Sequence, residues 1–263
     1  MNSTYIMGVI ADDAQRKIKL KWYEFWKRDK AEVFYIEKYD LVLVTAYLSQ
    51  NIEKIFKKEG VEKAVYTKEV ATRNPITDIE FTDGRSLFKK LLPDITKKVI
   101  KIAGIDKQNS LLAIIDNQLD GEIETLIEKL YGDFKHIILI TDNTVRAKEI
   151  AEKALDEYGL TIINSRINSK VNCDIALKIG SGFAKLPKHT ILIDASCEHN
   201  KTNKNVTINW VDLSKTIDLP FIFDSLEVTE CMEKVCGIEF NYKLSEFKFN
   251  GKTVSASKLV KKK

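Results

Sequence analysis

The chain has few of the residues that mark specialised classes of protein. Its 263 residues include four cysteines, three histidines and four prolines, and the cysteines form no CxxC pair. No zinc-ligand pattern is present, so we interpret the cysteines as buried free thiols and expect no metal site. No apolar run reaches the ~20 residues of a membrane span, and the N-terminus has no basic start followed by an apolar core. The sequence therefore predicts a cytoplasmic protein that does not enter the membrane.

Catalytic and nucleic-acid signatures are also missing. The sequence has no Walker loop, no Ser/His/Asp order and no metal-binding helix pattern. A net charge of +4, with acidic residues interleaved among the lysines, does not indicate a general nucleic-acid surface. One exception is the aromatic set at 22–26 beside basic residues, which could stack bases and contact phosphates. We favour a core-facing aromatic set there, so nucleic acid is a disfavoured partner.

Residues 136–167 have the pattern of a strand, a helix and a second strand. Residues 137–140 form a continuous apolar run, which is typical of a strand covered on both faces. Short polar side chains at 141–144 can accept hydrogen bonds from free N–H groups, and they predict a helix start. Apolar residues then recur at steps of three and four, and Gly159 predicts the helix end.

Two short motifs in this stretch carry a family resemblance. Val145-Arg146-Ala147 opens the helix, and Asn164-Ser165-Arg166 closes the following strand. This order resembles the cofactor module of the shikimate dehydrogenase and glutamyl-tRNA reductase group of Rossmann proteins. Strand-like runs at 173–177 and 190–194 extend the resemblance over roughly residues 134–196. The resemblance implies a Rossmann-like fold and NADP as cofactor, with Arg166 on its phosphate.

The chain departs from that family in the turn that should cradle the cofactor. No glycine occurs between Gly132 and Gly159. Side chains at 141–144 would hold a pyrophosphate away from the helix N-terminus, and the Asp142 carboxylate would repel it. The sequence therefore predicts a degenerate nucleotide-binding site, at which NADP is an open but disfavoured cofactor.

The alternation of strands and helices predicts the fold class and the domains. From Leu111 onward it predicts a mostly parallel sheet flanked by helices on both faces, whereas the N-terminal part is β-rich. Asn250-Gly251 predicts the tip of a hairpin. We expect a β-rich α+β domain at 1–85, a Rossmann-like α/β domain at 86–240, and a C-terminal hairpin with a basic tail at 241–263.

Ligands of open parallel sheets bind outside the carboxyl ends of the strands, and this rule selects the candidate site residues. The cofactor-binding candidates are Thr141, Asn143, Arg166, Gly180 and Gly182. The catalytic candidates, whose side chains can transfer protons or act as nucleophiles, are Asp194, Cys197 and His199.

Three hypotheses of function follow. The first is a non-catalytic Rossmann-like protein that binds a small molecule or a partner protein at the strand carboxyl edge. The second is a divergent NADP-dependent oxidoreductase of the shikimate dehydrogenase type. The third is a nucleic-acid or protein interaction module that uses the aromatic and basic N-terminal part. Assembly into a homo-oligomer stays open.

Overall fold

The computed structural model describes residues 4–16, 30–67, 70, 79–106, 109–134, 136–180, 182–196, 205–214 and 219–260. The chain forms two compact units, and each is built from two separate segments. Unit 1 comprises Met1–Leu87 and Asp212–Lys243, and unit 2 comprises Phe88–Val211 and Leu244–Lys263. The first division therefore lies close to the expected one at 85/86. Residues 212–240 differ from the expectation, because they belong to unit 1.

Unit 1 contains a five-stranded sheet of order β2-β3-β1-β4-β5. The strands are β1 (Tyr5–Ala11), β2 (Glu32–Ile36), β3 (Leu41–Tyr47), β4 (Lys63–Tyr66) and β5 (Glu80–Phe81). Strands β3 and β4 both pair with β1 in parallel, and β5 pairs with β4 in parallel. Only β2, paired with β3, is antiparallel. The N-terminal part is thus a parallel α/β layer with one antiparallel edge strand, and not the expected α+β arrangement.

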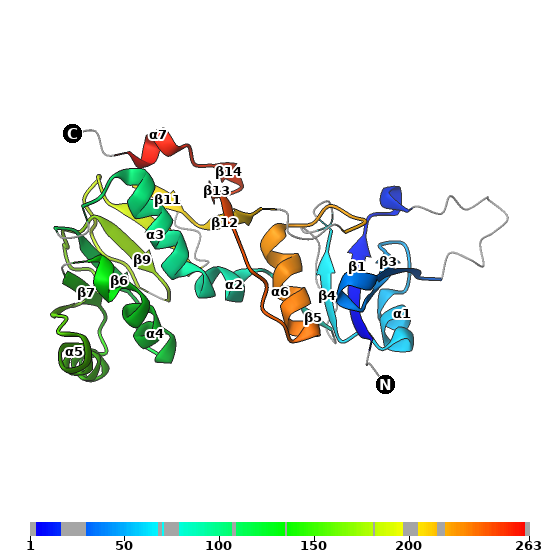
Figure 1. Ribbon diagram of the computed structural model, residues 1–263, viewed down its shortest axis with the longest axis horizontal. Helices are drawn as coiled ribbons and strands as arrows, with labels where there is room; N and C mark the ends of the chain where they lie inside the picture. Colours follow the sequence, from blue (N-terminus) through cyan, green and yellow to red (C-terminus); the bar gives the residue numbers. More distant parts are fainter. Residues whose placement is uncertain are drawn as a thin grey trace. The chain divides into compact units, whose positions relative to one another are not determined.

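Helices cover both faces of this sheet (Figure 1). Helix α1 (Ile52–Glu59) begins at the Asn51 cap, whose side chain accepts from the Lys54 N–H, and ends at Gly60. Its apolar side packs on one face of the sheet. Helix α6 (Ser225–Cys236) packs Cys231 and Met232 against the other face. This burial explains why residues 212–243 join unit 1, because the apolar side of α6 has its partner surface there.

Unit 2 contains a six-stranded parallel sheet of order β11-β10-β9-β6-β7-β8. The strands are β6 (Leu111–Ile115), β7 (His136–Ile140), β8 (Ile162–Ser165), β9 (Ile175–Lys178), β10 (Ile191–Asp194) and β11 (Val206–Ile208). Taken in chain order, this is the 3-2-1-4-5-6 arrangement of a Rossmann fold, with β6 as the first strand. The predicted fold class is therefore confirmed.

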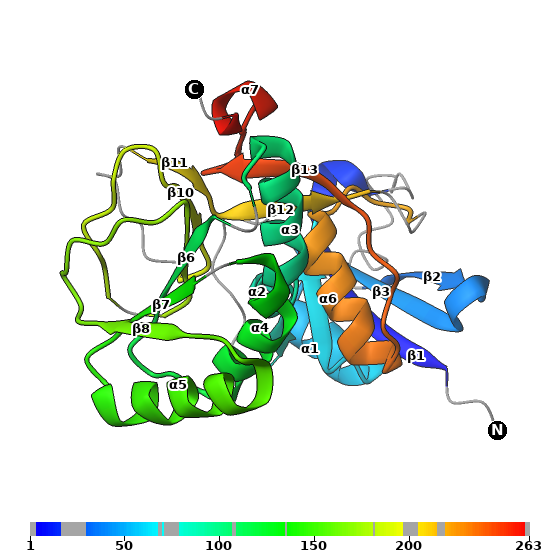
Figure 2. The same ribbon diagram turned by 60° about the vertical axis from the view of Figure 1, so that its left-hand side comes forward.

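The helices of unit 2 lie before and between the first three strands. They are α3 (Leu92–Ala103), α4 (Gly121–Leu130) and α5 (Thr144–Tyr158) (Figure 2), and α2 (Arg85–Lys90) precedes them. The predicted helix with its end at Gly159 is confirmed by α5.

Non-helical segments pack on part of one face of this sheet. This part is covered by Val171, Cys173, Ala184 and Leu186, which come from extended segments on either side of β9. Within the described part of 166–190 the chain forms no helix, so these two segments take the place of a helical layer.

The C-terminal segment forms the expected hairpin. Strand β13 (Leu244–Phe249) pairs with β14 (Lys252–Thr253) in an antiparallel ladder, and β12 (Trp210–Leu213) completes a three-stranded sheet. Asn250 and Gly251 both have positive φ, +48° and +77°, as a two-residue hairpin turn requires. A four-residue helix, α7 (Ala256–Leu259), follows. No helix in the described parts of the chain has the length and apolar character needed to cross a membrane.

Candidate functional site

The carboxyl edge of the unit 1 sheet has the topology of a binding crevice. The chain moves from β1 to β3 on one side and then crosses to β4 on the other side of β1. In doubly wound sheets, ligands bind at such a reversal, outside the carboxyl ends of the two diverging strands. Here those ends are Ala11, which is followed by Asp12, and Tyr66, which is followed by Thr67. The structure therefore indicates a site at strand ends of unit 1, where the sequence suggested no cofactor-binding or catalytic residue.

Buried polar side chains gather at this edge. Glu32, Thr45, Tyr47 and Thr67 are exposed by 8%, 0%, 1% and 0%. Thr45 and Tyr47 continue the alternation of Leu41 and Leu43, so they point to the α6 face of the sheet. Glu32 is the partner of Thr45 across the β2–β3 ladder. The edge cluster is defined here as Asp13, Gln15, Arg16, Glu32, Thr45, Tyr47 and Thr67.

Hydrogen bonds fix most of the edge cluster. The Tyr47 hydroxyl donates to Glu32 Oε2 at 2.7 Å, so the two side chains hold one another in place. The Thr67 hydroxyl donates to Gln15 Oε1 at 2.7 Å, which joins the end of β4 to the turn after β1. Asp13 Oδ2 accepts from the backbone N–H of Ser49 at 3.0 Å. Three strand ends are therefore tied together through side chains.

Arg16 is the cationic member of the edge cluster. Its guanidinium carbon lies 4.6 Å from the centre of the Tyr47 ring, and Nη2 lies 3.7 Å from Asp13 Oδ1. The side chain is only 15% exposed. The stacking on Tyr47 holds the planar guanidinium in one orientation.

Two buried atoms of the edge cluster have no hydrogen-bond partner among the residues that the structure describes. They are Arg16 Nη2 and the Thr45 hydroxyl oxygen. A buried polar group without a partner costs about 1–3 kcal/mol, and such groups are uncommon in folded proteins. A guanidinium donor and a hydroxyl are complementary to a carboxylate or phosphate oxygen. The edge cluster therefore has the chemistry to hold a compact anion.

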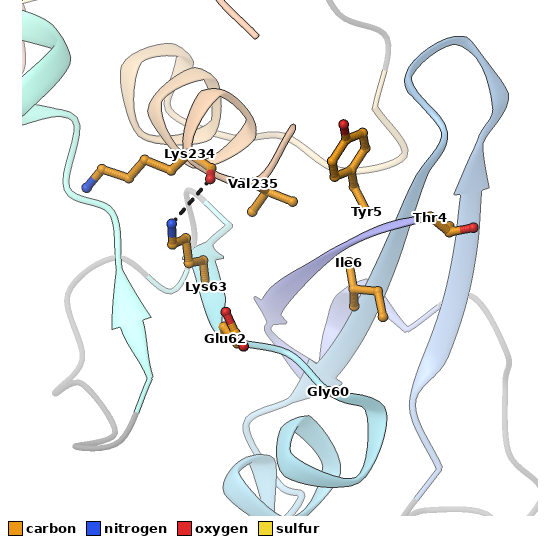
Figure 3. Close-up of a pocket in the computed structure, with 8 residues that line it drawn as sticks. All are labelled: Thr4, Tyr5, Ile6, Gly60, Glu62, Lys63, Lys234 and Val235. Carbon is orange, nitrogen blue, oxygen red and sulfur yellow. Dashed lines mark hydrogen bonds between the residues drawn. The ribbon is translucent and has the colours of Figure 1, made fainter. Parts of the chain in front are cut away.

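A cavity at the opposite edge of the sheet has a different character. Its volume is about 260 Å³, and Figure 3 shows the eight residues that line it: Thr4, Tyr5, Ile6, Gly60, Glu62, Lys63, Lys234 and Val235. The Lys63 ammonium donates to the Lys234 carbonyl at 3.2 Å, in the last turn of α6. Lys234 in turn pairs with Glu80 and Glu230 at 3.0 and 2.9 Å. The contacts of both lysines stabilise the C-terminal end of α6, so we assign this cavity a structural role.

The predicted cofactor residues of unit 2 fall into two groups that β6 separates. Thr141 and Asn143 follow β7, and Arg166 follows β8, whereas Gly180 and Gly182 follow β9. Thr141 is 2% exposed, and its hydroxyl oxygen accepts from the Asn143 N–H at 3.1 Å. Asn143 caps α5 by accepting from the Arg146 N–H at 3.2 Å. Both side chains support the start of α5, and Arg166 is exposed.

The catalytic candidates are placed only in part. Asp194 is the last residue of β10, is 8% exposed, and accepts from the Ser196 N–H and hydroxyl at 3.0 and 2.6 Å. Cys197 and His199 lie outside the described residues, as does the aromatic set at 22–26. The roles of these residues stay predictions.

The strand order corrects the position of the cofactor turn. Sequence analysis placed that turn at 141–144, after β7. The order 3-2-1-4-5-6 makes β6 the first strand, so the turn in question is Asp116–Asp120, before α4. Asp142 then stands at the end of the second strand, where a Rossmann fold contacts the ribose. Because β6 and β7 are equally apolar, their sequences did not distinguish the first strand from the second.

The edge cluster of unit 1 was missed by sequence analysis. Its one local signal is Asp12-Asp13 directly after the apolar run of β1, which we interpreted as a turn. Glu32, Thr45 and Thr67 are single polar residues in separate strands, and only the strand order brings them together. A prediction of parallel pairing around β1 would have been needed to find them.

Comparisons with known proteins give no relative by sequence, because no family model and no curated protein matches the chain. Among solved structures it is similar to L-tryptophan dehydrogenase from Nostoc punctiforme, with 10% identity, 89% of this chain and 76% of that chain covered, and a TM-score of 0.40. It is also similar to quinate dehydrogenase from Corynebacterium glutamicum, with 9% identity, 90% of this chain and 95% of that chain covered, and a TM-score of 0.36. For shikimate dehydrogenase from Aquifex aeolicus the identity is 11%, 98% of this chain and 97% of that chain are covered, and the TM-score is 0.35. Each of these three structures has a TM-score below 0.5, so the similarity is weak.

Proposed function

We propose that this protein is a non-catalytic binding protein that takes a small anionic ligand at the carboxyl edge of unit 1. One observation carries the proposal: among the described residues, neither Arg16 Nη2, after β1, nor the Thr45 hydroxyl, near the end of β3, has a hydrogen-bond partner, although both atoms are buried. An anion oxygen at Arg16 would accept the hydrogen bond that the 3.7 Å ion pair with Asp13 does not supply.

The hydrogen bonding of the edge cluster favours binding over catalysis. General acid–base and nucleophilic catalysis need an acid or base directed at the reacting group. Here Glu32 accepts from Tyr47, and Asp13 accepts from the Ser49 backbone N–H. Both carboxylates are therefore engaged in bonds that hold strand ends together. The remaining groups, Arg16 and Thr45, are a cation and a weakly acidic hydroxyl, which suit recognition.

Thermal unfolding with defined anions tests the proposal. Sodium acetate and sodium phosphate would be compared with sodium chloride at equal ionic strength. A ligand at 100 times its Kd adds about 2.7 kcal/mol, which for a protein of this size raises Tm by roughly 5–10 °C.

Two variants separate the site from a general salt effect. Arg16→Gln should abolish the shift, because it removes the charged donor. Arg85→Gln removes the same charge from an exposed arginine of unit 1 that pairs with Asp83, and it should keep the shift. A shift of equal size in Arg16→Gln and the unchanged protein would refute the proposal, as would the absence of any Arg16-dependent shift.

The second candidate is a divergent NADP-dependent oxidoreductase, and the Rossmann strand order of unit 2 is the observation in its favour. In that function Arg166 would contact the 2′-phosphate. However, Arg166 follows the third strand, whereas the second strand ends at Ile140 and is followed by Asp142, whose charge would repel a phosphate. Titration of NADPH into the unchanged protein and into Arg166→Ala tests this candidate. A large loss of affinity in the variant would favour it over the binding protein.

A further inference from the structure

A Rossmann unit that binds a dinucleotide needs two kinds of free space. The first βα turn must let the pyrophosphate approach the backbone, and the crevice between the first and fourth strands must be open. In unit 2 the turn is Asp116–Asp120, and the crevice lies between the ends of β6 and β9. The side chains in this turn and in this crevice determine whether a dinucleotide can bind there.

The Asp116 side chain fills the space beside the end of β9. It is 3% exposed, and its Oδ2 accepts from the backbone N–H of Leu119 at 2.8 Å. Leu119 itself is buried and has a φ of +51°, so the turn folds inward around the carboxylate. A Cβ atom built on Gly180 would lie 2.0 Å from Asp116 Oδ1. A side chain at position 180 would therefore force the Asp116 carboxylate to move.

Ile167 fills the neighbouring space. Gly182 has a φ of +118°, which by itself favours glycine, and a Cβ atom built on it would lie 2.3 Å from Ile167 Cδ1 and 3.7 Å from Ile115 Cγ2, at the end of β6. The Asn168 N–H donates to the Phe183 carbonyl at 2.9 Å, which pairs the two extended segments that follow β8 and β9. This pairing places Ile167 between the strand ends.

The charges at this edge oppose a pyrophosphate as well. Asp116 and Asp120 both lie in the first turn. The Asp120 side chain already accepts from the Glu122 N–H at 3.1 Å, so one of the free N–H groups at the start of α4 is occupied. A pyrophosphate there would meet carboxylates instead of N–H donors.

We infer that Asp116 and Ile167 are an internal plug of the unit 2 crevice, and that Gly180 and Gly182 accommodate this plug and not a dinucleotide. The residues present do not fit NAD or NADP. Unit 2 thus keeps the strand order of a cofactor domain while its own side chains occupy the cofactor position. This inference concerns unit 2 alone and does not depend on the ligand proposed for unit 1.

Two measurements test the plug. In the first, NADH and NADPH are titrated into the full chain and followed by nicotinamide fluorescence. We expect no saturable signal up to about 1 mM, the concentration scale of very weak binding. Saturable binding of either nucleotide below that concentration would overturn the inference.

The second measurement is a double-mutant cycle in Tm. Gly180 lacks a positive φ, so alanine there adds a methyl group without backbone strain. Gly180→Ala should lower Tm by at least about 4 °C in the unchanged protein and by less than half as much in an Asp116→Ala background. Equal losses in the two backgrounds would show that the plug does not exist. If Gly180→Ala alone does not fold, recovery of folding in Asp116→Ala/Gly180→Ala supports the plug, and failure to recover contradicts it.

Discussion

Glu227, in the first turn of α6, is expected to make the stability of unit 1 depend on pH. Burial raises the pKa of this carboxyl from its ordinary value of 4.5 to about 7, and the nearby Asp224, Asp83 and Glu230 carboxylates act in the same direction. The Thr82 hydroxyl donates to the backbone carbonyl of Glu227, so this hydrogen bond does not stabilise the charged side-chain carboxylate. Between pH 4.5 and about 7 the folded protein therefore keeps a proton on Glu227 that the unfolded chain has lost.

The sign and size of the effect follow from proton linkage. Below pH 4.5 both states are protonated, and Glu227 does not alter stability. Between 4.5 and about 7 the folded state binds more protons than the unfolded state, so stability falls as pH rises, and the full cost is reached above pH 7. The pKa difference corresponds at most to about 3.4 kcal/mol. Because part of the side chain contacts water, we expect about 1–2 kcal/mol.

Urea unfolding at pH 4 and pH 8 measures this cost. Glu227→Gln, which keeps the shape of the neutral acid, should match the unchanged protein near pH 4 and exceed its free energy of unfolding by about 1–2 kcal/mol at pH 8. Glu53→Gln, which removes an exposed carboxylate of α1 in the same unit, serves as the matched control. If Glu227→Gln and the unchanged protein lose stability in parallel between the two pH values, the reasoning is refuted.

Three further predictions concern packing, capping and thiol reactivity. Gly8→Ala should lower Tm by several degrees, because its Cβ would lie 2.6 Å from Val61 Cγ1 in the buried layer under α1; an unchanged Tm would contradict that packing. Asn143→Ala should lower the free energy of unfolding in urea by about 1 kcal/mol, because it removes the acceptor for the Arg146 N–H at the start of α5. Asn143→Asp keeps an acceptor oxygen there, so this variant should retain most of the stability that the alanine variant loses. Burial raises the pKa of the Cys231 thiol to about 12, so this thiol should not react with a maleimide at pH 8 in the folded protein; rapid labelling without unfolding would refute the assignment.

Local signals predicted the elements of the fold well. Helix α5 has a cap acceptor at Asn143 and a glycine stop at Gly159, where φ is +65°. The hairpin tip at Asn250-Gly251 needs positive φ at both positions, and few other residue pairs provide it. Such features depend on a few neighbouring residues, so the sequence contains the information directly.

The order of the strands depends on contacts between distant residues, and the sequence did not reveal it. Leu111–Ile115 and His136–Ile140 are both buried parallel strands, and nothing in either run shows that the first lies beside β9 and the second beside β8. The same applies to α6, whose apolar side fits the unit 1 sheet although it follows the whole of the Rossmann-like sheet in the chain. Long-range burial decided both placements, and pattern alone gives no measure of it.

The glycines at 180 and 182 show why a site is harder to predict than a fold. A glycine in a strand exit indicates that something approaches the backbone closely, and sequence analysis took a phosphate as the approaching group. The structure has the same close approach, but the approaching atoms belong to Asp116 and Ile167. Asp116 lies 64 positions before Gly180, so local sequence could not distinguish an internal partner from a ligand. The missing Cβ is therefore a signal of proximity, and its functional meaning depends on which residues the fold brings to that edge.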